Sequence, residues 1–301
     1  MKNVIVTGAN GFIGSSLIKK LIEHEVNVIA IDVSFANSRL PESEYIIKIE
    51  TSIDSKESLL SAIPPNEYDA FYHFAWRGVN GPDKASPEVQ LANIQLAIIC
   101  AQVSKVLDCK KILIAGTIAE ESVQSLSELS KTSGGMMYGT AKHCAHLMLE
   151  TYCKNMDQQF VWMQFSNIYG IGNKTGNLVS YTLAEILNDK EATFGPALQP
   201  YDFIYVDDLI EAVYRLGTIE VSHGSYFIGS GEPRILKDYL MEIGSITGKS
   251  SLVKIGIRPD DGIKYDFSMF DNSPLKKDIG EYVMTSFAQG IRKTVEWMEN
   301  L

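Results

Sequence analysis

The sequence contains few cysteines, and none of them lies in a C-x-x-C arrangement. Four occur among 301 residues, at positions 100, 109, 144 and 153. A chain of this length can build a core without cross-links, and disulfide frameworks are typical of short secreted domains. We therefore expect free thiols in a reducing, cytoplasmic location. His143 and His146 lie three positions apart without an evident third ligand, so we expect no bound metal.

Long apolar runs and excess positive charge are also missing. We find no apolar stretch that approaches the roughly 20 residues of a bilayer span, and the first predicted strand lies too close to residue 1 for a leader peptide. Asp and Glu outnumber Lys and Arg by 37 to 27, which gives a net charge of −10. Nucleic acids and anionic membranes attract surfaces rich in positive charge. We therefore expect neither a nucleic-acid nor a membrane partner.

The N-terminal half alternates short β-branched runs with amphipathic segments. The apolar runs that predict buried strands are Val4–Val6, Val26–Ile31, Tyr45–Ile49, Ala70–Phe74, Lys111–Ala115 and Phe160–Phe165. The segments that predict helices are Phe12–His24, Pro87–Leu107 and Tyr138–Cys153. Strands that are apolar on both faces and separated by helices form a parallel sheet covered on each side. This half is thus predicted to be an α/β doubly wound sheet of the Rossmann type.

The alternation loosens after Ser166, where loops rich in Gly, Asn and Pro appear. Helices are predicted near 178–189, 206–217, 235–247 and 286–300. We expect a dinucleotide-binding domain over 1–165 and a smaller, partly discontinuous substrate-binding domain over 166–301. Residues 203–226 are expected to return to the first domain, with Phe203–Val206 joining its sheet. Ligands of open α/β sheets bind at the carboxyl ends of the strands, so the second domain should cover that edge.

A glycine-rich segment, TGANGFIG, joins the first predicted strand to the first helix. Gly8 permits a tight turn, Gly11 lets the backbone approach a pyrophosphate, and Gly14 lets the helix pack closely on the strand. The helix N-terminus offers unpaired N–H groups to phosphates. A plain strand-to-helix turn is the alternative interpretation. The residues we expect to bind a dinucleotide here are Gly8, Asn10, Gly11, Phe12, Ile13 and Gly14.

Asp32 stands at the end of the second strand, 18 residues beyond Gly14. A carboxylate at this place accepts hydrogen bonds from the adenosine ribose and repels a 2′-phosphate, so NAD is favoured over NADP. Arg39 lies a few residues further on and can accommodate a phosphate. NADP therefore stays possible.

A tyrosine and a lysine four residues apart begin a predicted helix in Tyr138-Gly139-Thr140-Ala141-Lys142. This spacing places both side chains on one face, and a nearby ammonium favours phenolate, so we expect Lys142 to lower the pKa of Tyr138. Such a phenol can exchange a proton while a hydride leaves or joins the same carbon. Thr117, just past the fifth strand, can orient the reacting oxygen. An exposed helix pair and a helix-capping threonine are the alternatives.

Together these residues resemble the extended short-chain dehydrogenase/reductase family, specifically its nucleotide-sugar epimerases, dehydratases and 4-ketoreductases. The resemblance covers essentially the whole chain. Its elements, in order, are TGANGFIG, Asp32, Asp54, His73-Phe74-Ala75, Asn93, Thr117, Tyr138 with Lys142, Ser166-Asn167-Ile168-Tyr169-Gly170 and Asp202-Phe203-Ile204-Tyr205-Val206-Asp207-Asp208.

The resemblance implies further roles. Asp54 would contact the adenine of NAD, Phe74 and Ala75 would line the cofactor site, and Asn93 would belong to the helix beneath it. Lys142 would also hold the nicotinamide ribose. On the substrate side, Asn167 and Arg258 would bind the pyrophosphate of a nucleotide sugar. The helices around 87–107 and 138–154 resemble those that pair two subunits, so a homodimer is expected.

Two departures from the family pattern narrow the expected reaction. Dehydratases follow the catalytic Thr with an acidic pair, whereas Ile118 and Ala119 follow Thr117, so dehydration is disfavoured. An Arg commonly precedes the Asp-Phe segment and binds phosphate, but here the residue is Tyr201, which we place in the substrate site.

The leading hypothesis is an NAD(P)-dependent 4-ketoreductase that acts at C4 of a nucleoside-diphosphate hexose. Its compact length and the Ile255–Phe267 stretch resemble the reductases of the family. An NAD-dependent 4-epimerase is the alternative, favoured by Asp32. A non-catalytic NAD(P)-binding sensor is a remote alternative, because such proteins usually lose the Tyr or the Lys.

Overall fold

The computed structural model describes residues 1–128, 134–221, 224–260, 262 and 264–300. Its centre is a seven-stranded sheet in the order β11-β6-β5-β4-β1-β2-β3, and every neighbouring pair is parallel. The strands are β1 (Asn3–Thr7), β2 (Asn27–Asp32), β3 (Ile46–Glu50), β4 (Ala70–His73), β5 (Lys111–Thr117), β6 (Gln159–Phe165) and β11 (Ser225–Ile228). The predicted doubly wound sheet is confirmed.

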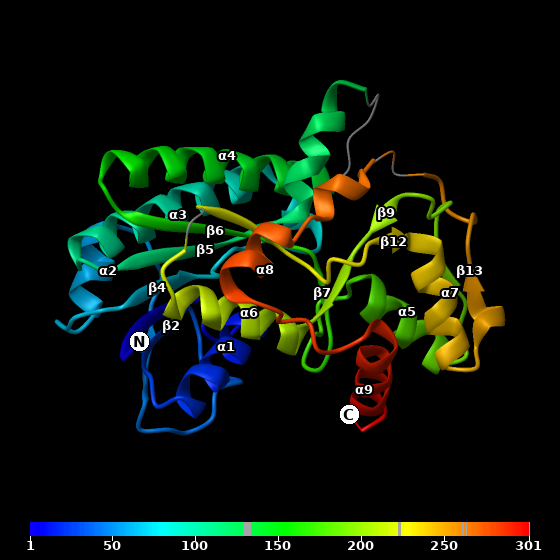
Figure 1. Ribbon diagram of the computed structural model, residues 1–301, viewed down its shortest axis with the longest axis horizontal. Helices are drawn as coiled ribbons and strands as arrows, with labels where there is room; N and C mark the ends of the chain where they lie inside the picture. The colour runs from blue at the N-terminus through cyan, green and yellow to red at the C-terminus, as the bar shows by residue number, and fades with distance from the viewer. Residues whose placement is uncertain (129–133, 222–223, 261, 263, 301) are drawn as a thin grey trace.

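Helices cover both faces of the sheet (Figure 1). One face carries α2 (Lys56–Ala62), α3 (Pro87–Val106) and α4 (Gly134–Asn155), and the other carries α1 (Phe12–Glu23) and α6 (Val206–Thr218). Alternate strand residues serve separate cores: on β1, Val4 and Val6 pack in the core that includes α1 and α6, and Ile5 packs in the core on the opposite face. This double burial explains why the strands are apolar on both faces.

Helix α3 differs from our prediction about apolar runs. It has 20 residues, and a window of 18 of them has a mean hydropathy of 1.3, which is enough by length and composition to cross a bilayer. The scattered amides of Gln90, Asn93 and Gln95 hid this in the sequence. In the structure Ala97 and Cys100 lie fully buried against the sheet, and α3 packs against α2 and α4. The apolar side chains of α3 therefore serve to pack it against the sheet and against α2 and α4.

The remaining elements gather beyond the carboxyl ends of the strands (Figure 1). They include α5 (Leu178–Leu187), α7 (Leu236–Ile246) and α9 (Phe287–Glu299), whereas α8 (Ser273–Ile279) packs against β11 and α6. Short strand pairs connect them: β7 (Asn167–Tyr169) with β10 (Phe203–Tyr205), β8 (Ala192–Thr193) with β13 (Val253–Lys254), and β9 (Pro200–Tyr201) with β12 (Arg234–Ile235). The 3₁₀ helices are η1 (Pro82–Ala85), η2 (Ile118–Glu128), η3 (Ser250–Leu252) and η4 (Phe267–Phe270).

The prediction that Phe203–Val206 joins the central sheet is wrong. The strand β10 pairs with β7 in a separate two-stranded sheet, and β11 is the strand that extends the central sheet by pairing with β6. The physical reason is that the three residues of β10 are buried among aromatic rings of the second half of the chain. The ring of Phe203, for example, packs edge-on against the rings of Tyr169 and Tyr239. An apolar run alone does not tell which sheet it joins.

Gly14→Ala should destabilise the fold, because a Cβ at this position would lie 2.2 Å from the Gly8 carbonyl oxygen and would push α1 away from the loop. We expect the free energy of unfolding to fall by about 1–3 kcal/mol in urea titrations. Gly11→Ala is the matched control, since its Cβ would lie 3.1 Å from the same oxygen and should cost less. A Gly14→Ala variant as stable as the parent would contradict this account of the packing.

Candidate functional site

Two cavities open along the carboxyl edge of the sheet, on either side of the glycine-rich loop. Cavity A, of about 550 Å³, reaches from that loop to Thr117, Tyr138 and Lys142. Cavity B, of about 610 Å³, reaches from the same loop to Asp32 and Asp54. Both are lined by Gly8, Gly11, Phe74 and Trp76, so they form one elongated trough. The trough crosses the sheet between β1 and β4, where the strand order reverses and open α/β sheets bind ligands.

The glycine-rich loop is shaped to let a ligand approach its backbone. Gly8 has a φ of +68°, and a Cβ there would lie 2.7 Å from the Ala75 nitrogen. Gly11 begins α1 as a cap without any side-chain hydrogen bond, which leaves the first N–H groups of the helix without a side-chain cap. These features fit the phosphates of a dinucleotide.

The acidic end of the trough is built by β2 and the segment after β3. Asp32 accepts hydrogen bonds from the Asn10 and Val33 backbone nitrogens, each at 2.8 Å. Asp54 lines cavity B with Ser52 and Ile53. Asn10 differs from the other predicted loop residues. Its side chain forms hydrogen bonds with the backbone of Ser34 and Arg39, and among the described residues it is not one that lines cavity A or cavity B.

Asn93 supports the trough through the loop that follows β4. It lines cavity B, is 3% exposed, and holds both backbone groups of Arg77 at 2.9 and 2.7 Å. Gln90, one turn earlier on α3, accepts a hydrogen bond from the Trp76 indole at 2.9 Å. The side-chain hydrogen bonds of Asn93 are thus made with the loop that follows β4.

Thr117 and Tyr138 meet in cavity A, although 20 residues separate them. Thr117 ends β5, Tyr138 lies in the second turn of α4, and the Thr117 hydroxyl is close enough to the phenol to influence its pKa. Burial raises the pKa of the Tyr138 phenol above its ordinary value, and the Thr117 hydroxyl offsets only part of this effect. The pKa of Tyr138 is therefore raised and not lowered as we expected, because desolvation of the phenolate dominates.

Lys142 is engaged elsewhere in the site. Its ammonium donates a hydrogen bond of 2.6 Å to the Ala115 carbonyl and lies 3.7 Å from the centre of the Trp76 ring. Burial lowers the pKa of Lys142 to about 7. The Trp76 ring in turn meets the Tyr138 ring edge-on, with centroids 6.3 Å apart. Trp76 thus links the lysine and the tyrosine, a role that its place after Ala75 did not reveal.

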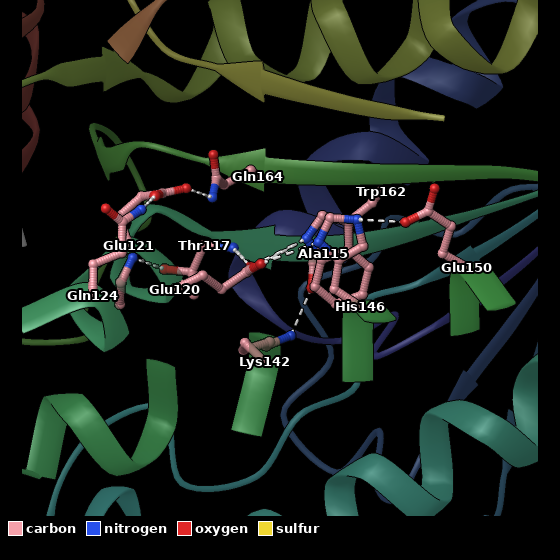
Figure 2. A network of polar contacts seen from close by, with 11 residues as sticks. Ala115, Thr117, Glu120, Glu121, Gln124, Lys142, His146, Glu150, Trp162 and Gln164 are labelled. Atoms are coloured by element: carbon pink, nitrogen blue, oxygen red, sulfur yellow. Dashed lines mark hydrogen bonds and ion pairs between the residues drawn. The ribbon is translucent and has the colours of Figure 1, made fainter. Parts of the chain in front are cut away.

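A buried carboxylate that we did not predict lies directly below Thr117 (Figure 2). Glu120 accepts hydrogen bonds from the Thr117 backbone nitrogen at 2.8 Å and from the Trp162 indole at 3.1 Å. His146 stacks on Trp162 with ring centroids 4.6 Å apart. In the sequence, Glu120 and Glu121 look alike; the pairing with Trp162 arises only when β6 is placed beside β5.

Lys84 is a second residue that sequence reasoning missed. It lies on η1, lines cavity A, and its ammonium sits 5.3 Å from the centre of the Tyr138 ring. Burial lowers its pKa, and the described residues provide no ion-pair partner for it. A cation without a carboxylate partner at this place suits an anionic ligand.

A third cavity, cavity C of about 530 Å³, continues from Thr117 and Tyr138 into the second half of the chain. Asn167, Tyr201 and Arg258, the predicted substrate residues, all line it. Arg258 donates hydrogen bonds to the Thr193 hydroxyl at 2.9 Å and the Tyr181 hydroxyl at 2.7 Å, and Asn167 donates to the Asp202 carbonyl at 3.1 Å. Among the residues that the structure describes, no group of His, Cys, Asp and Glu is arranged to hold a metal ion.

Comparisons with known proteins show the family and the fold of the chain. A model of the NAD dependent epimerase/dehydratase family matches residues 4–229. The chain is 26% identical to dTDP-4-dehydro-6-deoxyglucose reductase of Escherichia coli over 264 residues, 83% of each protein. It is 23% identical to a putative UDP-glucose 4-epimerase of Methanocaldococcus jannaschii, over 99% of this chain and 98% of that protein. The structure of UDP-glucose 4-epimerase from Thermotoga maritima with UDP-glucose superimposes with a TM-score of 0.79, at 21% identity and 99% coverage of both chains.

Lys142→Met should remove a pH dependence of stability. Because the pKa of Lys142 is about 7 when folded and lies at its ordinary, higher value when unfolded, the unfolded chain binds more protons between these values. This contribution to stability falls as the pH drops from about 10 to 7. We expect the stability gained by the Met variant to be largest near pH 7 and to vanish towards pH 10, at roughly 1.4 kcal/mol per unit of pKa depression. If the free energy of unfolding, measured in urea titrations, had the same pH dependence in the parent and in Lys142→Met, the lowered pKa of Lys142 would be contradicted.

Proposed function

Because the chain belongs to the NAD dependent epimerase/dehydratase family, we propose that it is an NAD(P)-dependent oxidoreductase that acts at C4 of a nucleoside-diphosphate hexose. One observation carries the proposal. Thr117 and Tyr138 both lie where cavity A, which begins at the glycine-rich loop, meets cavity C. A proton-transferring pair thus stands between a dinucleotide-shaped trough and a second ligand cavity.

The residues along the trough fit a dinucleotide. Gly8, Gly11 and the start of α1 would hold its pyrophosphate, and Asp32 and Asp54 would hold the adenosine. Lys142 would hold the second ribose at the other end of the trough. When bound, NAD(P) supplies or accepts the hydride at C4 of the sugar. We also propose that residues 1–165 form the cofactor part and residues 166–301 most of the substrate part.

Tyr138 would exchange the proton at the C4 oxygen. Its raised pKa keeps the phenol protonated at neutral pH, which is the form that donates a proton to a carbonyl oxygen as it is reduced. Thr117 would orient that oxygen through its own hydroxyl.

The substrate would lie in cavity C with its sugar at Thr117 and Tyr138. Arg258 and Asn167 would bind the diphosphate, and Tyr201 stands where the family's usual Arg is missing. The likeness to dTDP-4-dehydro-6-deoxyglucose reductase supports a nucleoside-diphosphate 4-keto-6-deoxyhexose as the substrate class. The test is a panel of UDP-, dTDP-, CDP- and GDP-sugars, followed by thermal shift and by consumption of NADH or NADPH. Protein that carries stoichiometric NAD and needs no added reductant would favour the 4-epimerase instead.

We further propose a cytoplasmic homodimer that pairs through α3 and α4. These helices lie side by side on one face of the sheet (Figure 1). Leu91 on α3 and Leu147 and Met148 on α4 are large apolar side chains that are 67%, 52% and 48% exposed. Exposed apolar groups concentrated on two adjacent helices are typical of an interface between subunits.

Tyr138→Phe should lower kcat by at least ~100-fold, because the variant keeps the ring and loses the proton donor. Binding of NAD(P), followed by fluorescence titration, should stay close to that of the parent. Tyr152→Phe, 14 residues further along the same helix α4, is the matched control, since Tyr152 packs against the core and, among the described residues, is not one that lines cavity A, B or C. If Tyr138→Phe turned over within a few-fold of the parent, Tyr138 would not be the proton donor.

Asp32→Asn should relax the choice between the two cofactors. The substitution removes the negative charge that a 2′-phosphate would meet, while the amide oxygen can still accept a hydrogen bond. We expect the ratio of kcat/KM for NAD to that for NADP to fall by about 10-fold, which corresponds to ~1.4 kcal/mol. Asp54→Asn is the control and should weaken both cofactors alike. An unchanged ratio in Asp32→Asn would show that another group sets the preference.

A further inference from the structure

Glu120 is a charged side chain that the fold encloses beside the catalytic pair. Its carboxylate is 2% exposed, and its hydrogen-bond donors come from two different strands. Thr117, at the end of β5, donates its backbone N–H at 2.8 Å, and Trp162 on β6 donates its indole N–H at 3.1 Å to each carboxylate oxygen. The His146 ring of α4 places Nδ1 3.4 Å from the carboxylate. Figure 2 shows these groups converging on Glu120.

The backbone makes room for this arrangement. A Cβ at residue 116 would lie 2.2 Å from the Trp162 indole nitrogen and 2.8 Å from Glu120 Oε1, so Gly116 is what allows both groups to reach the end of β5. Within the described residues, Glu120 is not among those that line cavities A, B or C. It therefore acts on the site from behind, without touching a ligand in any of them.

We propose that Glu120 is a positioning residue of the reaction: its carboxylate fixes the backbone of Thr117, and its buried negative charge acts on Lys142 and Tyr138. The inference rests on the proposed roles of Thr117, Tyr138 and Lys142, and it adds a residue that those roles do not require. A neutral hydrogen-bond acceptor would satisfy the N–H groups of Thr117 and Trp162. The hydrogen bonds therefore do not explain why the side chain is charged.

The electrostatic surroundings of Lys142 and Tyr138 support a role for the charge of Glu120. Burial lowers the pKa of Lys142 and the charge of Glu120 raises it; the same charge adds to the burial that raises the pKa of Tyr138. The remaining titratable groups around this cluster are His73 from β4, Lys84 from η1, His146 and Glu150 from α4, and Glu121 from η2. Burial lowers the pKa of His73 to about 3, so its ring stays neutral and adds no charge near pH 7.

Glu120→Gln separates the charge from the hydrogen bonds, because the amide oxygen can still accept from Thr117 and Trp162. The limb of the kcat–pH profile that belongs to the coupled Tyr138–Lys142 pair should move to lower pH by about one unit. The KM for the nucleotide sugar should change little. Glu120→Ala, which also leaves the Thr117 N–H without its acceptor, should lower kcat about 10-fold or more at every pH.

Glu121→Gln is the matched control. Glu121 lies on the same 3₁₀ helix, but it accepts hydrogen bonds from Gln124 at 2.6 Å and Gln164 at 2.9 Å. Its loss should leave the pH profile and kcat as they are in the parent.

A second readout needs no turnover. The Lys142 ammonium lies over the Trp76 ring, so the indole N–H resonance of Trp76 should titrate with Lys142 in ¹⁵N spectra, with peaks assigned by Trp→Phe variants. The midpoint should move to lower pH in Glu120→Gln and stay in place in Glu121→Gln. If no nucleotide sugar is turned over but this midpoint moves, the proposed function fails and the charge effect of Glu120 stands. A midpoint and a kcat limb that both stay unchanged in Glu120→Gln would overturn the inference.

Discussion

The hydrogen bond between the Lys142 ammonium and the Ala115 carbonyl is the contact on which the geometry of the site depends. It joins α4 to β5 in a place that is almost closed to water, with Lys142 3% exposed. Two residues beyond Ala115 the strand ends at Thr117, and one helical turn before Lys142 stands Tyr138. Fixing the helix on the strand at one point therefore brings the phenol and the hydroxyl together at the edge of the sheet.

Features that depend on neighbouring residues in the chain could be predicted from the sequence. The strands β1, β5 and β6 are continuous apolar runs. The glycine-rich loop could be recognised from the spacing of Gly8, Gly11 and Gly14 between a strand and a helix. Thr117, Tyr138 and Lys142 could also be singled out, since a threonine at a strand end and a tyrosine–lysine pair one turn apart are local patterns. Their common place in cavity A follows from the parallel sheet.

Features that depend on three or more elements could not be predicted. The buried environment of Glu120 depends on Trp162 on β6 and His146 on α4, which are 42 and 26 positions away in the sequence. The destination of β10 depended on the aromatic rings that cover it, and nothing within Phe203–Tyr205 encodes it. The pKa of Tyr138 moved against our expectation for a similar reason: the spacing revealed a nearby ammonium, whereas the burial that outweighs it is a property of the folded chain.

Burial acts on Tyr138 and Lys142 in two opposite directions, and in each case it favours the uncharged form. It raises the pKa of the phenol and lowers that of the ammonium, because both charged forms lose hydration. At neutral pH the site therefore holds a firmly protonated Tyr138 beside a Lys142 near the midpoint of its titration. A carbonyl that becomes an alkoxide needs one proton from the phenol, and the nearby ammonium is a group from which that proton can be restored. The negative charge of Glu120 raises the pKa of both groups, so the enclosed carboxylate favours their protonated forms more than burial alone would.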